Sequence, residues 1–159
     1  MKKLLLSSLM VLLLAVVVAG TAFAAPAADR QLLLKGSIQS QETYSIDFPI
    51  MSVNATGSGT ATQLGQFNVT YQVAVNLLTV SGPGSIQFVA ANGDSLFGQG
   101  SGQASDTGTP GVFNVVETYT ITGGTGRFAG ASGSITLDRI VDTNTGVTSG
   151  TMSGAILLP

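Results

Sequence analysis

Two alternating runs of apolar and polar residues flank a glycine-rich loop at residues 122–130, and this pattern constrains the fold most. Apolar side chains recur at alternate positions over residues 113–121 and again over residues 135–141, interrupted only by Glu117 and Arg139. A period of two is typical of strands with one buried face. Glycines supply the positive φ angles that a tight turn needs. The pattern therefore predicts an antiparallel β-hairpin.

A register for this hairpin follows if the two strands pair about Phe128. It gives four cross-strand pairs: Ile121 with Ile135, Tyr119 with Leu137, Glu117 with Arg139, and Val115 with Val141. In this register a carboxylate and a guanidinium face each other on an otherwise apolar surface. The pair Glu117/Arg139 is therefore the first candidate for a functional site.

The remaining chain after residue 30 shows the same alternation. Further strands are expected over residues 31–48, ending at Pro49, and over residues 53–62, 67–76, 85–90, 95–103 and 147–158. Turns are expected at Ser81–Gly84 and at residues 142–146, and an exposed loop at residues 105–111. About eight antiparallel strands without a helix predict an all-β fold, either a closed barrel or a sandwich. We favour the eight-stranded antiparallel β-barrel because closure removes free strand edges.

The connection Ala91–Asp94 has two possible geometries. A two-residue Asn-Gly turn pairs Phe88 with Phe97. A turn one residue longer, with Gly93 left-handed, aligns the apolar residues on both sides: Ile86, Phe88 and Ala90 with Leu96 and Gly98. We prefer the longer turn, which leaves Val89 and Phe97 facing outward.

The N-terminus has the features of a secretory signal peptide. Lys2 and Lys3 precede an apolar run over residues 4–18, and Ala22–Ala24 fits a cleavage site. The run is short for a membrane-spanning helix, which needs about 20 apolar residues. The predicted organisation is a signal peptide at 1–24, a flexible lead at 25–30 and a β-barrel domain at 31–159. We expect a secreted or periplasmic protein with no membrane association after cleavage.

Charge and composition exclude several function classes. Without the signal peptide, four of the six basic residues remain against eight acidic ones, a net charge of −4. That balance argues against nucleic-acid binding, which needs a basic patch. The sequence has no histidine and no cysteine. Neither a Ser-His-Asp triad nor a usual zinc site can form, and we predict no cofactor and no metal.

The ion pair Glu117/Arg139 has two interpretations. One is that it forms a polar spot in an apolar cavity that orients a small amphiphile, together with other side chains of the expected inner faces. The other is a structural ion pair near one barrel mouth. The predicted ligand-binding set is Glu117, Arg139, Tyr119, Glu42, Tyr44 and Tyr71. Tyr71 enters this set as a core side chain rather than a proton donor.

Three segments in this order carry a resemblance to a known family: Gly59–Phe67, Ala91–Leu96 and the glycine-rich Gly123–Gly133. They resemble the allene oxide cyclase and dirigent barrel superfamily, and more closely its secreted bacterial allene oxide cyclase barrel-like members. The resemblance implies an eight-stranded antiparallel barrel, often oligomeric in plant relatives. Plant allene oxide cyclases cyclise a fatty-acid epoxide, and dirigent proteins steer phenoxy-radical coupling. Only the glycine-rich hairpin can be matched to the family residue by residue, and its role is structural.

Three functions stay open from the sequence. The first is a secreted, non-catalytic barrel that binds a small apolar ligand in the barrel or at its mouth. The second is an isomerase-like or dirigent-like enzyme acting on a lipid-like or phenolic substrate, with Glu117 polarising the substrate and Arg139 tuning that carboxylate. The third is a surface protein that self-assembles through Val89 and Phe97, which also leaves a homo-oligomer open.

Overall fold

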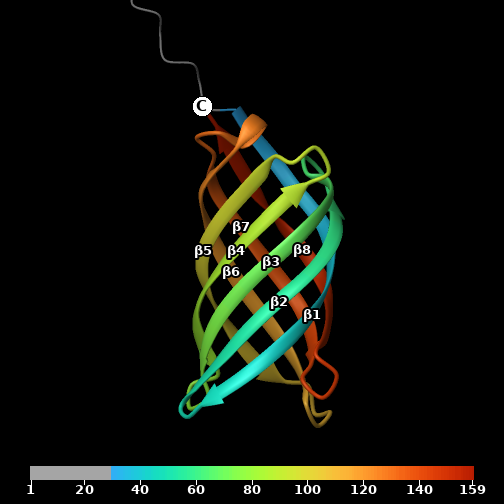
Figure 1. The fold of residues 1–159 in the computed structure, drawn as a ribbon, viewed down its shortest axis with the longest axis vertical. Helices are drawn as coiled ribbons and strands as arrows, with labels where there is room; N and C mark the ends of the chain where they lie inside the picture. The colour runs from blue at the N-terminus through green and yellow to red at the C-terminus, as the bar shows by residue number, and fades with distance from the viewer. Residues whose placement is uncertain (1–29) are drawn as a thin grey trace, which may run out of the picture.

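Eight antiparallel strands close into a barrel in the computed structural model, which describes residues 30–159 (Figure 1). In chain order they are β1 (Arg30–Asp47), β2 (Ile50–Ala61), β3 (Gly65–Asn76), β4 (Ser81–Ala90), β5 (Ser95–Asp106), β6 (Val112–Gly124), β7 (Ser132–Asp142) and β8 (Val147–Leu158). A 3-10 turn, η1 (Gly126–Phe128), joins β6 to β7. The all-β barrel prediction is confirmed. The predicted signal peptide and residues 25–29 of the expected lead lie outside the described residues, whereas Arg30, also assigned to that lead, begins β1.

Each strand pairs with its neighbours in the chain, and the last strand returns to the first. β1 pairs antiparallel with β8, from Arg30 opposite Leu158 to Gln41 opposite Val147. This pairing closes the cylinder, so no strand among residues 30–159 keeps a free edge. The strands are tilted against the barrel axis, as closure requires (Figure 1).

The barrel end that holds the C-terminus is packed with side chains. Figure 1 shows η1, in orange, at the same end of the barrel as the C-terminus and the start of β1. Phe128 of η1 and Leu64 of the β2/β3 turn are 1% and 2% exposed and join the main hydrophobic core. The Arg127 guanidinium donates a hydrogen bond to the Leu64 carbonyl at 3.3 Å, linking the two turns. These contacts close this end of the barrel.

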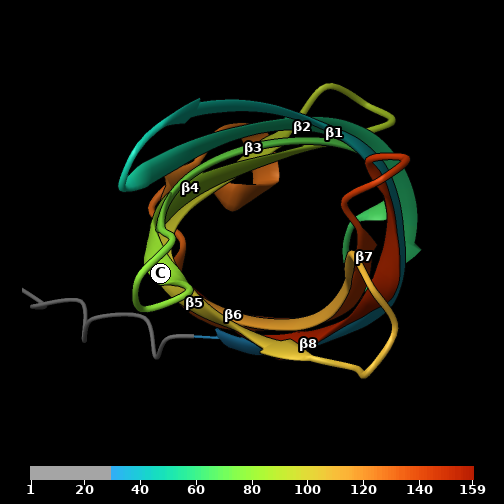
Figure 2. The same cartoon turned by 90° about the horizontal axis from the view of Figure 1, so that it is seen from below.

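The opposite end is formed by four turns, at residues 48–49, 77–80, 107–111 and 143–146. Figure 2 views the barrel from this end, with the strands arranged as a ring. Apolar side chains stand exposed on two neighbouring turns, with Phe48 at 69% and Leu78 at 71%. The two turns are joined by a hydrogen bond from the Leu77 amide to the Pro49 carbonyl at 2.8 Å. Among residues 30–159, no helix is long and apolar enough to cross a membrane.

The predicted register of the central hairpin is wrong by two residues. Glu117 lies opposite Leu137 and Tyr119 opposite Ile135, while Arg139 lies opposite Val115. The connection is not symmetric about Phe128, because this residue belongs to η1 and turns its ring into the core. An even shift leaves every side chain on its predicted face. Glu117 and Arg139 are therefore diagonal neighbours on the inner wall rather than a directly opposed pair.

The predicted turn at Ser81–Gly84 is also wrong, because these residues begin β4 and the turn precedes them at 77–80. The ladder between β3 and β4 is interrupted here: Val73 pairs with Gly84, and the next pair is Asn76 with Ser81. A side chain at Gly82 would collide with the backbone of β3. Gly82 thus allows β3 to approach closely, and Pro83, which has no N–H to donate, lies where the ladder is interrupted.

The preferred geometry of the β4/β5 turn is confirmed. Phe88 lies opposite Leu96 and Ile86 opposite Gly98. Gly93 is left-handed, with φ of 88°. Val89 lies at an outward-facing position and is half-buried, as is Phe97.

Candidate functional site

A cavity of about 400 Å³ opens at the end of the barrel formed by the four turns. Its walls are mostly apolar and come from six strands and the β3/β4 turn: Ile46, Met51, Val53, Val73, Val75, Leu77, Val80, Ala104, Phe113, Val115 and Val141. Its polar lining includes Glu42, Tyr44, Glu117 and Arg139. The volume lies in the range of small-molecule sites. The cavity is thus an apolar pocket with a charged floor.

Arg139 of β7 is the centre of this floor. Its Nε donates to Oε2 of Glu117 at 3.0 Å, and its Nη2 lies 2.9 Å from the same oxygen. Its Nη1 lies 2.7 Å from Oε1 of Glu42, 2.6 Å from the Tyr71 hydroxyl and 3.1 Å from the Thr148 hydroxyl. The guanidinium carbon also lies 4.6 Å from the centre of the Tyr71 ring. One cation is therefore held by groups from β1, β3, β6 and β8.

Glu42 of β1 connects this centre to the cavity mouth. Its Oε1 accepts a hydrogen bond from the Tyr71 hydroxyl at 2.7 Å. Its Oε2 accepts a hydrogen bond from the Tyr44 hydroxyl at 2.9 Å. The Ser40 hydroxyl lies within hydrogen-bond distance of Tyr71 at 2.8 Å. The network thus extends from buried Ser40 to half-buried Tyr44.

Strand periodicity explains why residues so distant in sequence meet here. Glu42, Tyr71, Glu117, Arg139 and Thr148 all occupy inward positions of their strands, and each is at most 5% exposed. Space for the longer side chains is provided by a glycine on β5. A Cβ at Gly102, which lies opposite Glu117, would come within 2.5 Å of the Glu117 Cγ. Gly102 thereby leaves room for the carboxylate side chain.

The floor is charged and removed from solvent. Glu117 is 2% and Arg139 3% exposed. Among residues 30–159, no fully buried side-chain nitrogen or oxygen lacks a hydrogen-bond partner. Burial raises the pKa of the Glu117 carboxyl, and the Arg139 guanidinium opposes this shift. Burial alone disfavours the cation, but the neighbouring Glu117, Tyr71 and Glu42 raise the pKa of Arg139 and keep it charged. A buried charge requires such hydrogen-bonding and oppositely charged partners.

Burial also raises the pKa of all three tyrosine hydroxyls in the protein. Tyr44 and Tyr71 lie next to Glu42, and Tyr119 lies next to Glu117. A neighbouring carboxylate disfavours phenolate formation. The three hydroxyls are therefore neutral donors at neutral pH.

All six residues of the predicted set come together at this floor, but at different depths. Glu42, Tyr44, Glu117 and Arg139 line the cavity. Tyr71 and Tyr119 lie below them in the core, at 2% and 1% exposure. Whether these residues bind a ligand stays a prediction. Both interpretations of the ion pair fit its position, because it is buried and also borders the cavity.

Two members of the network were missed by sequence reasoning. Ser40 and Thr148 are buried hydroxyl residues on inward positions of β1 and β8. Their inward parity was visible from the alternation, but hydroxyl residues also populate the outer faces of these strands. A buried polar position beside predicted buried charges is the signal that points to them.

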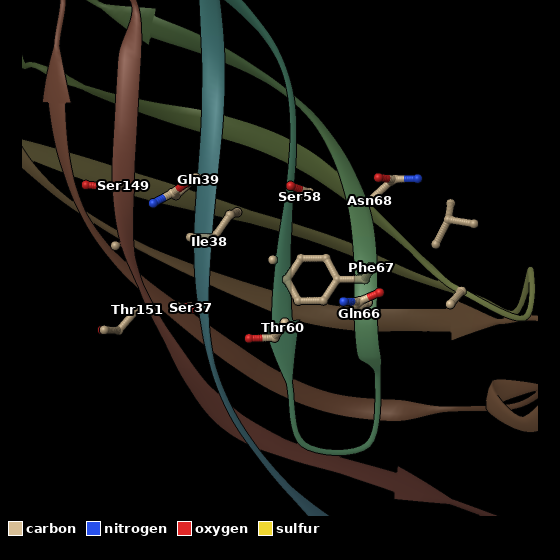
Figure 3. Close-up of a pocket in the computed structure, with 14 residues that line it drawn as sticks. Ser37, Ile38, Gln39, Ser58, Thr60, Gln66, Phe67, Asn68, Ser149 and Thr151 are labelled. Atoms are coloured by element: carbon tan, nitrogen blue, oxygen red, sulfur yellow. The ribbon is translucent and has the colours of Figure 1, made fainter.

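A larger hollow of about 830 Å³ lies on the outer wall of the barrel, across β8, β1, β2 and β3 (Figure 3). It is lined mostly by short hydroxyl and amide side chains, such as Ser58, Thr60 and Asn68. None of its lining residues is ionisable. Since the buried charges lie inside the barrel, the internal cavity and not this larger groove is the candidate site. Within residues 30–159, no group of three or more His, Cys, Asp or Glu side chains is placed to hold a metal ion.

Comparisons with known proteins address the fold. No family model and no curated protein matches the sequence. Among solved structures, the pterocarpan synthase dirigent protein GePTS1 superposes with a TM-score of 0.58 and 12% sequence identity, over 86% of this chain and 93% of that chain. The barrel has a dirigent-type fold. The resemblance carried by the three segments is thus confirmed for the fold, while the narrower assignment to secreted bacterial relatives stays a prediction.

Proposed function

We propose that this dirigent-type barrel binds a small, mostly apolar molecule in its open-ended cavity, with the polar group of the molecule directed to the floor. The observation that supports this proposal is the cavity itself, about 400 Å³ with apolar walls that end at Glu117 and Arg139. Ligand sites typically combine an apolar lining with a few fixed polar groups. The similar structure is named a pterocarpan synthase, which associates the fold with small-molecule chemistry.

The tyrosines provide a direct binding assay. The protein has three tyrosines and no tryptophan: Tyr44 lines the cavity, and Tyr71 and Tyr119 lie below its floor. Intrinsic tyrosine fluorescence therefore reports on this region alone. We expect a saturable change on titration with an uncharged amphiphile such as 1-decanol.

A substitution that fills the cavity, compared with the same substitution on the outer wall, tests where the ligand binds. Ala104 lines the cavity, whereas Ala74 is exposed on the outer wall of β3. Ala104→Phe is expected to weaken 1-decanol binding by about tenfold or more, and Ala74→Phe to leave it within about twofold, because only the former occupies ligand volume. Equal affinities in both variants would place the binding elsewhere.

A second candidate function is catalysis on a lipid-like or phenolic substrate. The observation that favours it is the buried Glu117 side chain at the border of an apolar cavity. Burial raises the pKa of this carboxyl, and a carboxyl with a raised pKa suits general acid catalysis. An unsaturated epoxide and a phenolic substrate are the two probes. Loss of turnover in Glu117→Gln with retained binding would support an enzyme.

Native mass spectrometry of protein from its own host tests the broader proposal. A co-purifying small molecule supports the binding function, and its absence together with a stable oligomer supports self-assembly through Val89 and Phe97. The mass of the mature chain also tests secretion, because cleavage after Ala24 is the expected outcome.

A further inference from the structure

The charges of the barrel are distributed unequally between its two ends. At the open end, Asp47, Asp106 and Asp142 stand at the ends of β1, β5 and β7. The closed end carries the basic residues Arg127 of η1 and Arg30 at the start of β1, against one acidic residue, Asp94, which lies 3.7 Å from Arg127. A ligand entering the cavity therefore passes a negatively charged rim, and charged rims above low-dielectric walls concentrate ions of the opposite sign.

The cavity floor has the same sign. It holds two carboxylates, Glu42 and Glu117, and one guanidinium, Arg139. With all three ionised, the formal charge of the floor is negative. Inside an apolar pocket this charge acts more strongly than in water, because the effective dielectric constant is lower.

The hydrogen-bonding capacity left at the floor belongs mainly to acceptors. A carboxylate offers about four acceptor sites. On Glu117, Oε2 receives the contacts of Arg139, and the Tyr119 hydroxyl, with its single O–H, can occupy at most one further site. At least one site on this 2%-exposed side chain thus stays open while the residue borders the cavity. Arg139, by contrast, directs its Nε and Nη1 donors at protein oxygens, and its Nη2 lies 2.9 Å from the same Glu117 oxygen.

From this arrangement we infer that the cavity selects amphiphiles by the head group: it accepts heads that donate hydrogen bonds, cationic ones best, and rejects anionic heads. This inference rests on the proposed binding function. A primary ammonium supplies three donors and a charge opposite to that of the floor and the rim. A carboxylate or phosphate head meets like charges, which oppose binding strongly. Fatty-acid anions are therefore outside the ligand class of this cavity.

Three ligands with the same chain and different heads test the inference: decylamine, 1-decanol and decanoate, titrated by tyrosine fluorescence at about pH 8 and low ionic strength, below micelle formation. Decylamine is expected to bind most tightly, 1-decanol more weakly, and decanoate at least about tenfold more weakly than 1-decanol. Decanoate binding as tightly as 1-decanol would overturn the head-group inference and leave the binding function intact. Binding of none of the three would overturn both.

Two matched variants identify the source of the selectivity. Glu117→Gln removes a charge from the floor, and Asp138→Asn removes one from the exposed outer wall of β7. The ratio of decylamine to decanoate affinity is expected to fall about tenfold in the first and to change less than about twofold in the second. An equal fall in both would assign the preference to overall charge and overturn the inference. If Glu117→Gln does not fold, the wild-type ranking decides, and Asp106→Asn at the rim is expected to reduce the same ratio.

Discussion

Arg139 is the residue on which the polar floor depends, because it is the cation shared by two buried carboxylates. Its Nη1 binds Glu42 at 2.7 Å and its Nη2 lies 2.9 Å from Glu117. Removing the cation leaves two like charges in a low-dielectric interior, whereas removing one carboxylate leaves a paired cation. We therefore expect removal of Arg139 to lower the free energy of unfolding more than removal of one carboxylate.

The stability of three variants tests this asymmetry. Arg139→Met is expected to lower the free energy of unfolding by about 3–5 kcal/mol, the usual cost of breaking a buried ion pair. Glu117→Ala is expected to cost about 1–3 kcal/mol, because Glu42 still pairs with the guanidinium. The exposed Asp138→Ala serves as control, within about 0.5 kcal/mol of wild type. Chemical denaturation measures all three, and an Arg139→Met variant as stable as wild type would contradict the buried network.

The three tyrosine hydroxyls give a second residue-scale prediction. Their pKa values are raised by burial above the ordinary value of 10.0. Because the native state keeps these protons where the unfolded state loses them, their contribution to stability is complete below about pH 10 and is lost as the pH rises further. We expect the phenolate absorbance to show no titration step near pH 10 before the protein unfolds. The same titration in denaturant is the control, and a native step for two or more tyrosines would refute the burial.

At the scale of elements, the sequence predicts which face a side chain occupies better than which partner it meets. Alternation placed Glu117 and Arg139 on one inner wall, and the structure confirms that face while moving their pairing by two residues. The face depends only on the period of two, whereas register depends on loop geometry. The ring of Phe128 enters the core, a tertiary contact that local pattern does not contain. The glycine and proline at 82–83 failed as a turn signal for a similar reason, since β3 approaches them closely.

The β3/β4 turn contains an unusual backbone conformation that can be tested. Val80 has a φ of 48°, where a β-branched residue is strained. Asparagine tolerates this conformation, so Val80→Asn is expected to raise the free energy of unfolding by about 1 kcal/mol. Val116 is equally exposed, at 41% against 40%, but lies in the extended strand β6. Val116→Asn is therefore expected to destabilise, because asparagine is disfavoured in strands. Denaturation midpoints that move in the same direction for both variants would contradict the strain.

At the scale of the whole molecule, the barrel combines a packed half with a hollow half. Large aromatic rings fill the packed half, where Phe67 and Phe88 meet edge to face with centroids 5.3 Å apart. Around the cavity the inward positions carry smaller side chains, such as Val53, Val73 and Val75. An eight-stranded barrel is close to the size at which side chains just fill the interior. Strand count therefore predicts the cylinder from the sequence, but whether a cavity remains depends on the summed volumes of side chains brought together only in the closed fold.

Closure of the cylinder by β1 and β8 leads to the last prediction, which concerns chain connectivity. Arg30 lies opposite Leu158 in the ladder, so a short Gly/Ser linker can join the two ends of the domain. A permuted chain opened between Gly108 and Thr109 breaks an exposed turn at the open end. We expect this permutant to fold cooperatively, because all eight ladders can still form and exposed turns tolerate new termini.

The matched permutant is opened between Arg127 and Phe128 in η1. New termini there free the 1%-exposed Phe128 from its place in the closed end, and the loss of a buried aromatic ring costs about 3–5 kcal/mol. Thermal melts followed by circular dichroism are expected to show a clearly lower Tm for this chain than for the chain opened at Gly108. Equal Tm values for the two permutants would mean that the closed end contributes no more to stability than the open mouth. That result would contradict the division of the barrel into a packed half and a hollow half.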